Sequence, residues 1–229
     1  MTDDRPLILW FRRDLRLADH PMLSQAVATG RPLLPVFILD TETEAIGAAP
    51  KWRLGLAIAA FAETLERMGS RLILRRGPAL EVLRALISET GAGGVHWSRA
   101  YDLASKARDT AVKTALRTTG IAAESHAGFL LHEPWTVQTG QGGFYRVYTP
   151  YWNAVRGRDV GAPLPAPRSL PAPTAWPASD RIADWQMGAV MRRGAAVCLP
   201  YQAVGEAAAQ TRLETFISTK VQVYREARD

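Results

Sequence analysis

Short apolar segments alternate with longer amphipathic segments from the start of the chain to about residue 126. The apolar segments have the length of strands, and the segments between them have the periodicity of helices. The predicted strands are Leu7–Phe11, Leu33–Leu39, Arg71–Leu74, Gly94–Trp97 and Ile121–Glu124. Strands that alternate with helices favour a parallel sheet built from right-handed crossovers. We therefore predict an α/β fold with a Rossmann-like five-stranded parallel sheet and helices on both faces.

The clearest helical pattern lies between residues 51 and 68. Its apolar residues are spaced by four, three and four positions, which places them on one face: Leu54, Ile58, Phe61 and Leu65. This is the spacing of a helix that covers a core. Glycines follow several helical segments, where a left-handed helix end favours this residue: Gly30, Gly69, Gly91 and Gly120.

The composition changes after about residue 156. Six prolines between positions 163 and 177 predict an extended connector, and we assign 157–204 to a proline-rich linker. A final helix is predicted over 205–229, with an apolar stripe at Leu213, Ile217, Val221 and Tyr224. Its β-branched residues weaken the helical pattern. A single helix of this length gains little stability without a packing partner, so this segment needs one.

Composition and charge bear on whether the protein binds a polyanion and whether it contains a membrane segment. The chain has 229 residues, 47% of them hydrophobic, and a formal net charge of +6. A basic balance is compatible with a polyanionic partner, but the basic residues are scattered rather than clustered. No apolar run approaches the roughly 18 residues of a membrane span, and no N-terminal signal segment is visible. We expect a cytoplasmic protein without a membrane segment.

The cysteine and the histidines do not show the sequence spacing of a disulfide or a metal site. Cys198 is the single cysteine, which excludes an internal disulfide, and we expect it to pack as a small apolar side chain. The histidines lack the spacing of metal ligands along the chain. They are His20, His96, His126 and His132. We therefore predict structural roles for them and no metal site.

A charged run follows the first predicted strand directly. Residues 10–20 read Trp-Phe-Arg-Arg-Asp-Leu-Arg-Leu-Ala-Asp-His. Side chains at the C-terminal edge of a parallel sheet are where open α/β folds bind ligands, but such a cluster can equally be a set of structural ion pairs. The glycine-rich phosphate loop of dinucleotide-binding proteins is absent from this place. The sequence therefore argues against an ordinary dinucleotide-dependent dehydrogenase.

The same run resembles the N-terminal signature of the DNA photolyase and cryptochrome family. The matching positions are Trp10, Phe11, Arg12, Asp14, Leu15, Arg16 and Asp19. Further segments that resemble the family follow in order: 36–40, 69–77, Trp97 with Tyr101–Asp102 and Arg108–Asp109, 145–151, and a set of positions between 205 and 229. The resemblance thus covers nearly the whole chain and is weakest between about 157 and 204.

The resemblance implies a domain organisation and a function. Residues 1–130 correspond to the core of the antenna domain and 131–156 to its end, followed by the interdomain linker 157–204. Residues 205–229 correspond to the first helix of a truncated FAD-binding helical domain. The implied protein is a deoxyribodipyrimidine photolyase, in which an antenna pigment passes excitation to FAD and the flavin repairs cyclobutane pyrimidine dimers in DNA. The resemblance implies that the catalytic half is missing from this chain, so we expect no catalytic residue in it and no activity of the chain alone.

The resemblance also implies site residues. Tyr224 matches a tyrosine that reaches the flavin phosphates, and Arg228 matches an arginine near the DNA. The positions that match the antenna site of the deazaflavin-binding branch are Arg13, Phe37, Leu39, Asp40 and Lys51. The folate-binding branch uses an Asn-Glu pair where this chain has Ala104 and Ser105, which cannot form the same hydrogen bonds. This argues against a standard folate site but leaves the identity of the antenna chromophore open, and a deazaflavin antenna, a flavin antenna and an empty pocket all stay open.

Two other functions stay open from the sequence. The first is a cryptochrome-type module, in which blue light changes a partner interaction and no DNA is repaired. The second is a stand-alone nucleotide-binding α/β protein that dimerises through its last helix.

Overall fold

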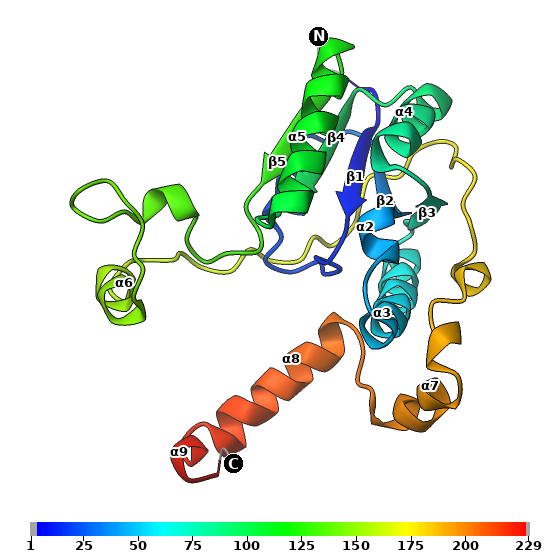
Figure 1. Ribbon diagram of the computed structural model, residues 1–229. Coiled ribbons are helices and arrows are strands. Elements are labelled where there is room, and N and C mark those ends of the chain that lie inside the picture. The colour runs from blue at the N-terminus through cyan, green and yellow to red at the C-terminus, as the bar shows by residue number, and fades with distance from the viewer. Residues whose placement is uncertain (1–3, 228–229) are drawn as a thin grey trace.

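The computed structural model describes residues 4–227 and contains one five-stranded sheet in the order β3-β2-β1-β4-β5. Each pair of neighbouring strands is parallel (Figure 1). The strands are β1 (Leu7–Phe11), β2 (Leu33–Leu39), β3 (Ile73–Arg76), β4 (Gly94–Ser98) and β5 (Ala122–His126). The predicted α/β class and parallel sheet are confirmed.

The two outer strands differ in position from the prediction. β3 begins at Ile73, which pairs with Val36, so Arg71 and Leu72 precede the strand. β5 continues to His126, whose partner is Ser98. In both cases pairing with the neighbouring strand sets the bounds, and the apolar pattern of one segment cannot show that pairing.

Helices cover both faces of the sheet (Figure 1). Alternate residues of β1 belong to different cores: Leu9 packs with residues of α1 and α3, and Trp10 packs with residues of α4 and α5. These helices are α1 (Pro21–Ala28), α3 (Ala48–Arg67), α4 (Ala79–Thr90) and α5 (Leu103–Thr118), with the short α2 (Thr41–Glu44) at the end of β2. The predicted apolar face of α3 is buried at Ile58, Phe61 and Leu65. Gly91 ends α4 with a φ of 65°, as its predicted capping role requires.

The segment after β5 wraps around the sheet and is attached to it. Its first part contains η1 (Pro134–Thr136) and α6 (Tyr148–Val155). The proline-rich part is extended, and its backbone hydrogen-bonds the sheet: the Leu33 amide donates to Pro171 O at 2.8 Å, and the Asp180 amide donates to Leu74 O at 2.9 Å. Leu170, Trp185 and Met187 are buried with the α1 and α3 core. The segment predicted as a linker therefore contributes to the core of the α/β layer.

Short helices occupy the later part of this segment. They are η2 (Ile182–Trp185), η3 (Ala189–Met191), α7 (Arg193–Cys198) and η4 (Leu199–Tyr201). The periodicity did not predict them, because elements of this length contain at most about two helical turns and show no repeating pattern. Cys198 is half-buried in α7.

The C-terminal helical segment extends away from the sheet (Figure 1). It consists of α8 (Glu206–Thr215), a π-helical stretch, η5 (Phe216–Lys220), and α9 (Tyr224–Ala227). The carboxylate of Glu206 accepts hydrogen bonds from the amides of Leu17 and Ala18 at 2.7 and 2.8 Å, which holds the start of α8 to the α/β layer. The predicted stripe is exposed along its length; Ile217, for example, is 57% exposed. Among the helices described between residues 4 and 227, none combines the length and apolar character needed to cross a membrane.

Candidate chromophore pocket

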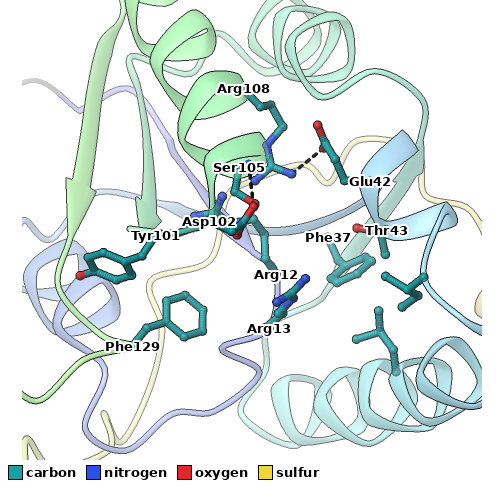
Figure 2. Close-up of a pocket in the computed structure, with 13 residues that line it drawn as sticks. Arg12, Arg13, Phe37, Glu42, Thr43, Tyr101, Asp102, Ser105, Arg108 and Phe129 are labelled. Carbon is teal, nitrogen blue, oxygen red and sulfur yellow. Dashed lines mark hydrogen bonds and ion pairs between the residues drawn. The ribbon is translucent and has the colours of Figure 1, made fainter. Parts of the chain in front are cut away.

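A cavity of about 330 Å³ lies at the carboxyl ends of β1, β2 and β4. The chain runs outward from β1 through β2 to β3, and then returns to place β4 on the other side of β1. Ligands of open α/β sheets bind at this topological switch point. Figure 2 shows the pocket, whose lining residues are Arg12, Arg13, Phe37, Glu42, Thr43, Ile46, Leu54, Ala100, Tyr101, Asp102, Ser105, Arg108 and Phe129.

The turn after β1 brings Arg12 and Arg13 to the pocket. Asp14 fixes this turn, because its buried carboxylate accepts a hydrogen bond from the Arg12 amide at 2.8 Å. The other carboxylate oxygen lies 3.2 Å from Nε2 of the buried His20. Burial by itself would raise the pKa of Asp14, but the hydrogen bond and charge of His20 outweigh it and lower the pKa to about 2. Asp14 thus fixes the backbone of the turn that carries the two arginines.

Carboxylates surround the guanidinium groups of Arg12 and Arg108. Arg12 Nη1 lies 2.8 Å from both oxygens of Asp109. Arg108 Nη1 donates to Asp40 at 2.7 Å and to Glu42 at 2.8 Å. Burial would lower the pKa of Arg108, but the charges of Asp109 and Asp40 raise it. These contacts join the ends of β1 and β2 to α5.

Trp10 forms the floor below these two arginines. The guanidinium carbons lie 4.8 Å (Arg12) and 4.9 Å (Arg108) from the centre of its ring. This is the geometry of cation–π contacts. Trp10 is fully buried, so the charged network rests on the apolar core between the sheet and α5.

The opposite wall comes from the turn between β4 and α5. Asp102 caps α5 by accepting a hydrogen bond from the Ser105 amide at 2.9 Å, and this bond is the main cause of its lowered pKa. Tyr101 donates its hydroxyl hydrogen to Glu133 at 2.7 Å, and burial together with this carboxylate raises the pKa of the phenol. Both side chains are therefore oriented before any ligand binds.

Arg13 differs from its neighbours in the pocket. Within residues 4–227 it forms no hydrogen bond or ion pair, and its charge contributes to the lowered pKa of Asp102. Its side chain is exposed, and Arg13 and Phe37 both line the pocket (Figure 2). A guanidinium without an ion-pair partner, in a pocket that also has aromatic rings, is suited to a planar ligand with an anionic group.

The residues predicted for the antenna site divide into two groups. Arg13 and Phe37 line the pocket. Asp40 does not line the pocket itself. It forms an ion pair with the pocket residue Arg108, and it caps α2 by accepting a hydrogen bond from the Thr43 amide. Leu39 is 3% exposed and packs in the core, and Lys51 donates its ammonium hydrogen to Glu44 O, so neither lines the pocket.

Tyr224, the residue predicted for the flavin, does not line this pocket. Tyr224 is 53% exposed in α9, and its ring packs edge-on against the ring of Phe216, with 5.6 Å between the two ring centres. Arg228 lies outside the described residues. Of the two positions compared with the folate-binding branch, Ser105 lines the pocket and Ala104 does not.

Several pocket residues were not predicted as site residues. Arg12, Tyr101, Asp102 and Arg108 occur in the segments that resemble the family, but their convergence depends on the order of strands in the sheet. Phe129 gave no sequence signal because it follows β5 in an irregular segment. Arg12 could have been found from its position directly after a predicted strand, whereas Arg108 lies within α5 and had no such signal.

Comparison with known proteins identifies the family. The family description "DNA photolyase" matches residues 7–169. The chain belongs to the DNA photolyase family. It is 43% identical over 225 residues to a deoxyribodipyrimidine photo-lyase of Agrobacterium fabrum, and 35% identical over 156 residues to cryptochrome-2 of Arabidopsis thaliana. The recognition made from the sequence motifs is confirmed.

The solved structures support the same assignment for this photolyase-family chain. The crystal structure of a class III photolyase from Agrobacterium tumefaciens matches 95% of the chain with a TM-score of 0.90 and 42% identity. A cryptochrome of Synechocystis matches 79% with a TM-score of 0.68 and 22% identity, a likeness of fold. The chain spans 47% of the length of the Agrobacterium fabrum photo-lyase, 25% of cryptochrome-2 and 45% of the class III photolyase chain.

Proposed function

We propose that the pocket binds a light-harvesting chromophore and that the chain is the antenna part of a deoxyribodipyrimidine photolyase. The observation that carries this proposal is Arg13, a cation that forms no hydrogen bond or ion pair among residues 4–227, in a pocket that also holds the rings of Phe37, Tyr101 and Phe129. Aromatic rings offer stacking surface to a conjugated pigment, and the guanidinium offers charge-assisted hydrogen bonds to an anionic group.

The rigidity of the pocket supports the antenna role. Arg12 and Arg108 are held by carboxylates, and the start of α5 is capped by Asp102. A pigment that transfers excitation must keep one orientation relative to its acceptor, and fixed walls provide that orientation. Glu42 is already paired with Arg108, so its charge repels an anionic pigment less than a free carboxylate would.

In the whole photolyase the acceptor would be FAD, and the substrate would be DNA that contains cyclobutane pyrimidine dimers. Tyr224 would donate a hydrogen bond to the flavin phosphates, and Arg228 would contact a DNA phosphate. We assign domains as predicted: 1–130 and 131–156 to the antenna domain, 157–204 to the linker and 205–229 to the start of the FAD domain. The protein supplies position and charge, and the flavin supplies the electron-transfer chemistry.

Binding of pigments tests the pocket directly. The 229-residue chain is titrated with a deazaflavin, with flavin mononucleotide and with methenyltetrahydrofolate, and binding is followed by the pigment's fluorescence. We expect one of the two flavin-type pigments to bind more tightly than the folate. R13Q should weaken binding by about tenfold, the effect of losing one charge-assisted hydrogen bond.

Two control variants test whether the effect of R13Q is specific to the pocket or follows from the loss of any positive charge. R168Q changes an exposed arginine of the linker segment, and K51Q changes the predicted residue that lies outside the lining. Both should bind the pigment as the unchanged chain does. Absence of binding for all pigments, or equal loss in R13Q and R168Q, would overturn the proposed antenna site.

A cryptochrome-type sensory module is the second candidate, because cryptochrome-2 is also 35% identical over 66% of the chain. Repair of thymine-dimer DNA under blue light by the product of the whole reading frame distinguishes the two functions. Repair supports the photolyase, whereas flavin-containing protein without repair supports the sensory module. The 229-residue chain alone should neither hold FAD stoichiometrically nor distinguish damaged DNA from intact DNA.

A further inference from the structure

A second group of polar side chains lies on the neighbouring strands β4 and β5, outside the pocket. His96 on β4 is the direct cross-strand neighbour of Glu124 on β5, and His126 lies two residues further along β5 on the same face. One ligand atom from each residue lies within 4.8 Å of the other two. The two imidazole rings lie 4.9 Å apart, measured between ring centres. None of these residues lines the chromophore pocket.

The histidines are buried but incompletely bonded. Each is 6% exposed, and within residues 4–227 His96 Nδ1 and His126 Nε2 have no hydrogen-bond partner. A buried ring nitrogen without a partner is costly and calls for an explanation. The exposed carboxylate of Glu124 lies beside them and gives solvent access to the group. The group therefore combines two buried imidazole rings with one exposed carboxylate.

The chemistry of these ligands selects a class of ion. Imidazole nitrogens with one carboxylate form a typical three-residue ligand set for zinc. We propose that His96, Glu124 and His126 bind a divalent transition-metal ion, and that zinc is the ion whose preferences they match. Ligand atoms of a tetrahedral zinc ion are about 3.4 Å apart, given metal–nitrogen distances of about 2.0–2.1 Å. The ligand atoms of His96, Glu124 and His126 all lie within 4.8 Å of one another, so side-chain movements of about an ångström would have to accompany binding.

Electrostatics favour the ligand form of both histidines. Burial lowers the pKa of His96, and burial together with the neighbouring His96 lowers the pKa of His126 to about 4. A metal ion binds the neutral form of an imidazole, which a lowered pKa favours, and the proposal itself rests on the geometry of the three side chains. Arg31 and Arg99 add positive charge near the group, so binding of a cation depends on the carboxylate of Glu124.

The proposed ion would join the edge strand β5 to β4. β5 ends the sheet on this side, and its outer edge has no partner strand among the described residues. An ion held by one residue of β4 and two residues of β5 would connect these two strands in addition to their backbone hydrogen bonds. Binding to the folded state alone raises stability with metal concentration, so the melting temperature of the metal-loaded chain should exceed that of the metal-free chain.

Metal titration of the 229-residue chain tests the proposal. After removal of metal by a chelator, zinc is added in competition with a chromophoric chelator, and the ring nitrogen NMR signals of the histidines are recorded. We expect one zinc ion per chain, with changes in the signals of His96 and His126 but not of His20 or His132. E124Q, which alters an exposed side chain and should fold normally, should weaken binding by about tenfold or more.

Three control variants make the result specific. E63Q changes an exposed glutamate of α3, H132Q changes one of the two histidines outside the group, and C198S removes the single thiol. All three should retain zinc binding and the rise in melting temperature, and H126Q should lose both. The proposal is overturned if the unchanged chain binds no zinc, if E124Q binds it as well as E63Q does, or if binding is lost in H132Q or C198S.

Discussion

The buried Asp14–His20 pair allows a quantitative prediction for the turn that carries the pocket arginines. Asp14 is 1% exposed and His20 is fully buried. The pKa of Asp14 falls from its ordinary value of 3.8 to about 2. Each unit of pKa corresponds to about 1.4 kcal/mol of stability. We therefore expect D14N, which keeps the shape but removes the charge, to lower the free energy of unfolding by about 2–3 kcal/mol.

The pH dependence of this loss has a defined sign. The pKa of the carboxyl group is lower in the folded state than in the unfolded state, so its stabilisation is complete above the ordinary pKa of 3.8. The stabilisation is lost as the pH falls through the folded pKa of about 2. The difference in stability between the unchanged chain and D14N should therefore be full at about pH 5 and should shrink between about pH 4 and pH 2.

Urea unfolding, monitored by tryptophan fluorescence at a series of pH values, measures this difference. D184N is the control, because Asp184 is exposed and its loss should change stability by less than about 0.5 kcal/mol. A loss in D14N below about 0.5 kcal/mol, or one that stays constant down to about pH 2, would refute the reasoning. Because Asp14 also holds the Arg12 amide, D14N should weaken pigment binding at the neighbouring Arg13.

Three further predictions concern the core, the charged network and the start of α8. L83A removes a fully buried side chain beneath the sheet and should cost about 2–5 kcal/mol in thermal or urea unfolding; a loss below about 1 kcal/mol would contradict the packing described. R108M leaves three carboxylates without their shared cation and should lower stability by about 1–3 kcal/mol, whereas R168Q should not. E206Q should speed hydrogen exchange of the Leu17 and Ala18 amides, which donate to its carboxylate; unchanged exchange would show that these bonds do not hold α8.

Local sequence patterns are sufficient to predict most of the α/β layer. The apolar segments near positions 7 and 33 form strands that are buried on both faces, which favours continuous apolar sequence. The spacing of Ile58, Phe61 and Leu65 predicts the buried face of α3 for a similar reason, since a helix repeats every 3.6 residues. The family resemblance depends on such local segments in their order along the chain.

The linker and the C-terminal segment show where local patterns fail. The proline-rich segment predicts an extended chain, which is correct, but not its backbone bonds to Leu33 and Leu74. Those bonds join residues more than a hundred positions apart, and composition contains no information about them. The stripe near Ile217 predicts a packed helix face, yet this face is exposed and the helix changes to π geometry. Periodicity indicates which residues could be buried, whereas burial itself needs a partner surface.

The sequence alone determined the fold class, the family and two of the residues that line the pocket, Arg13 and Phe37. Only the tertiary structure decided that Arg108 reaches Asp40 across the sheet edge and that His96, Glu124 and His126 meet on neighbouring strands. The physical reason is the order of the strands. Secondary structure follows from interactions over a few residues, whereas a site at a sheet edge depends on which strands become neighbours, and that choice is made by packing of the whole core.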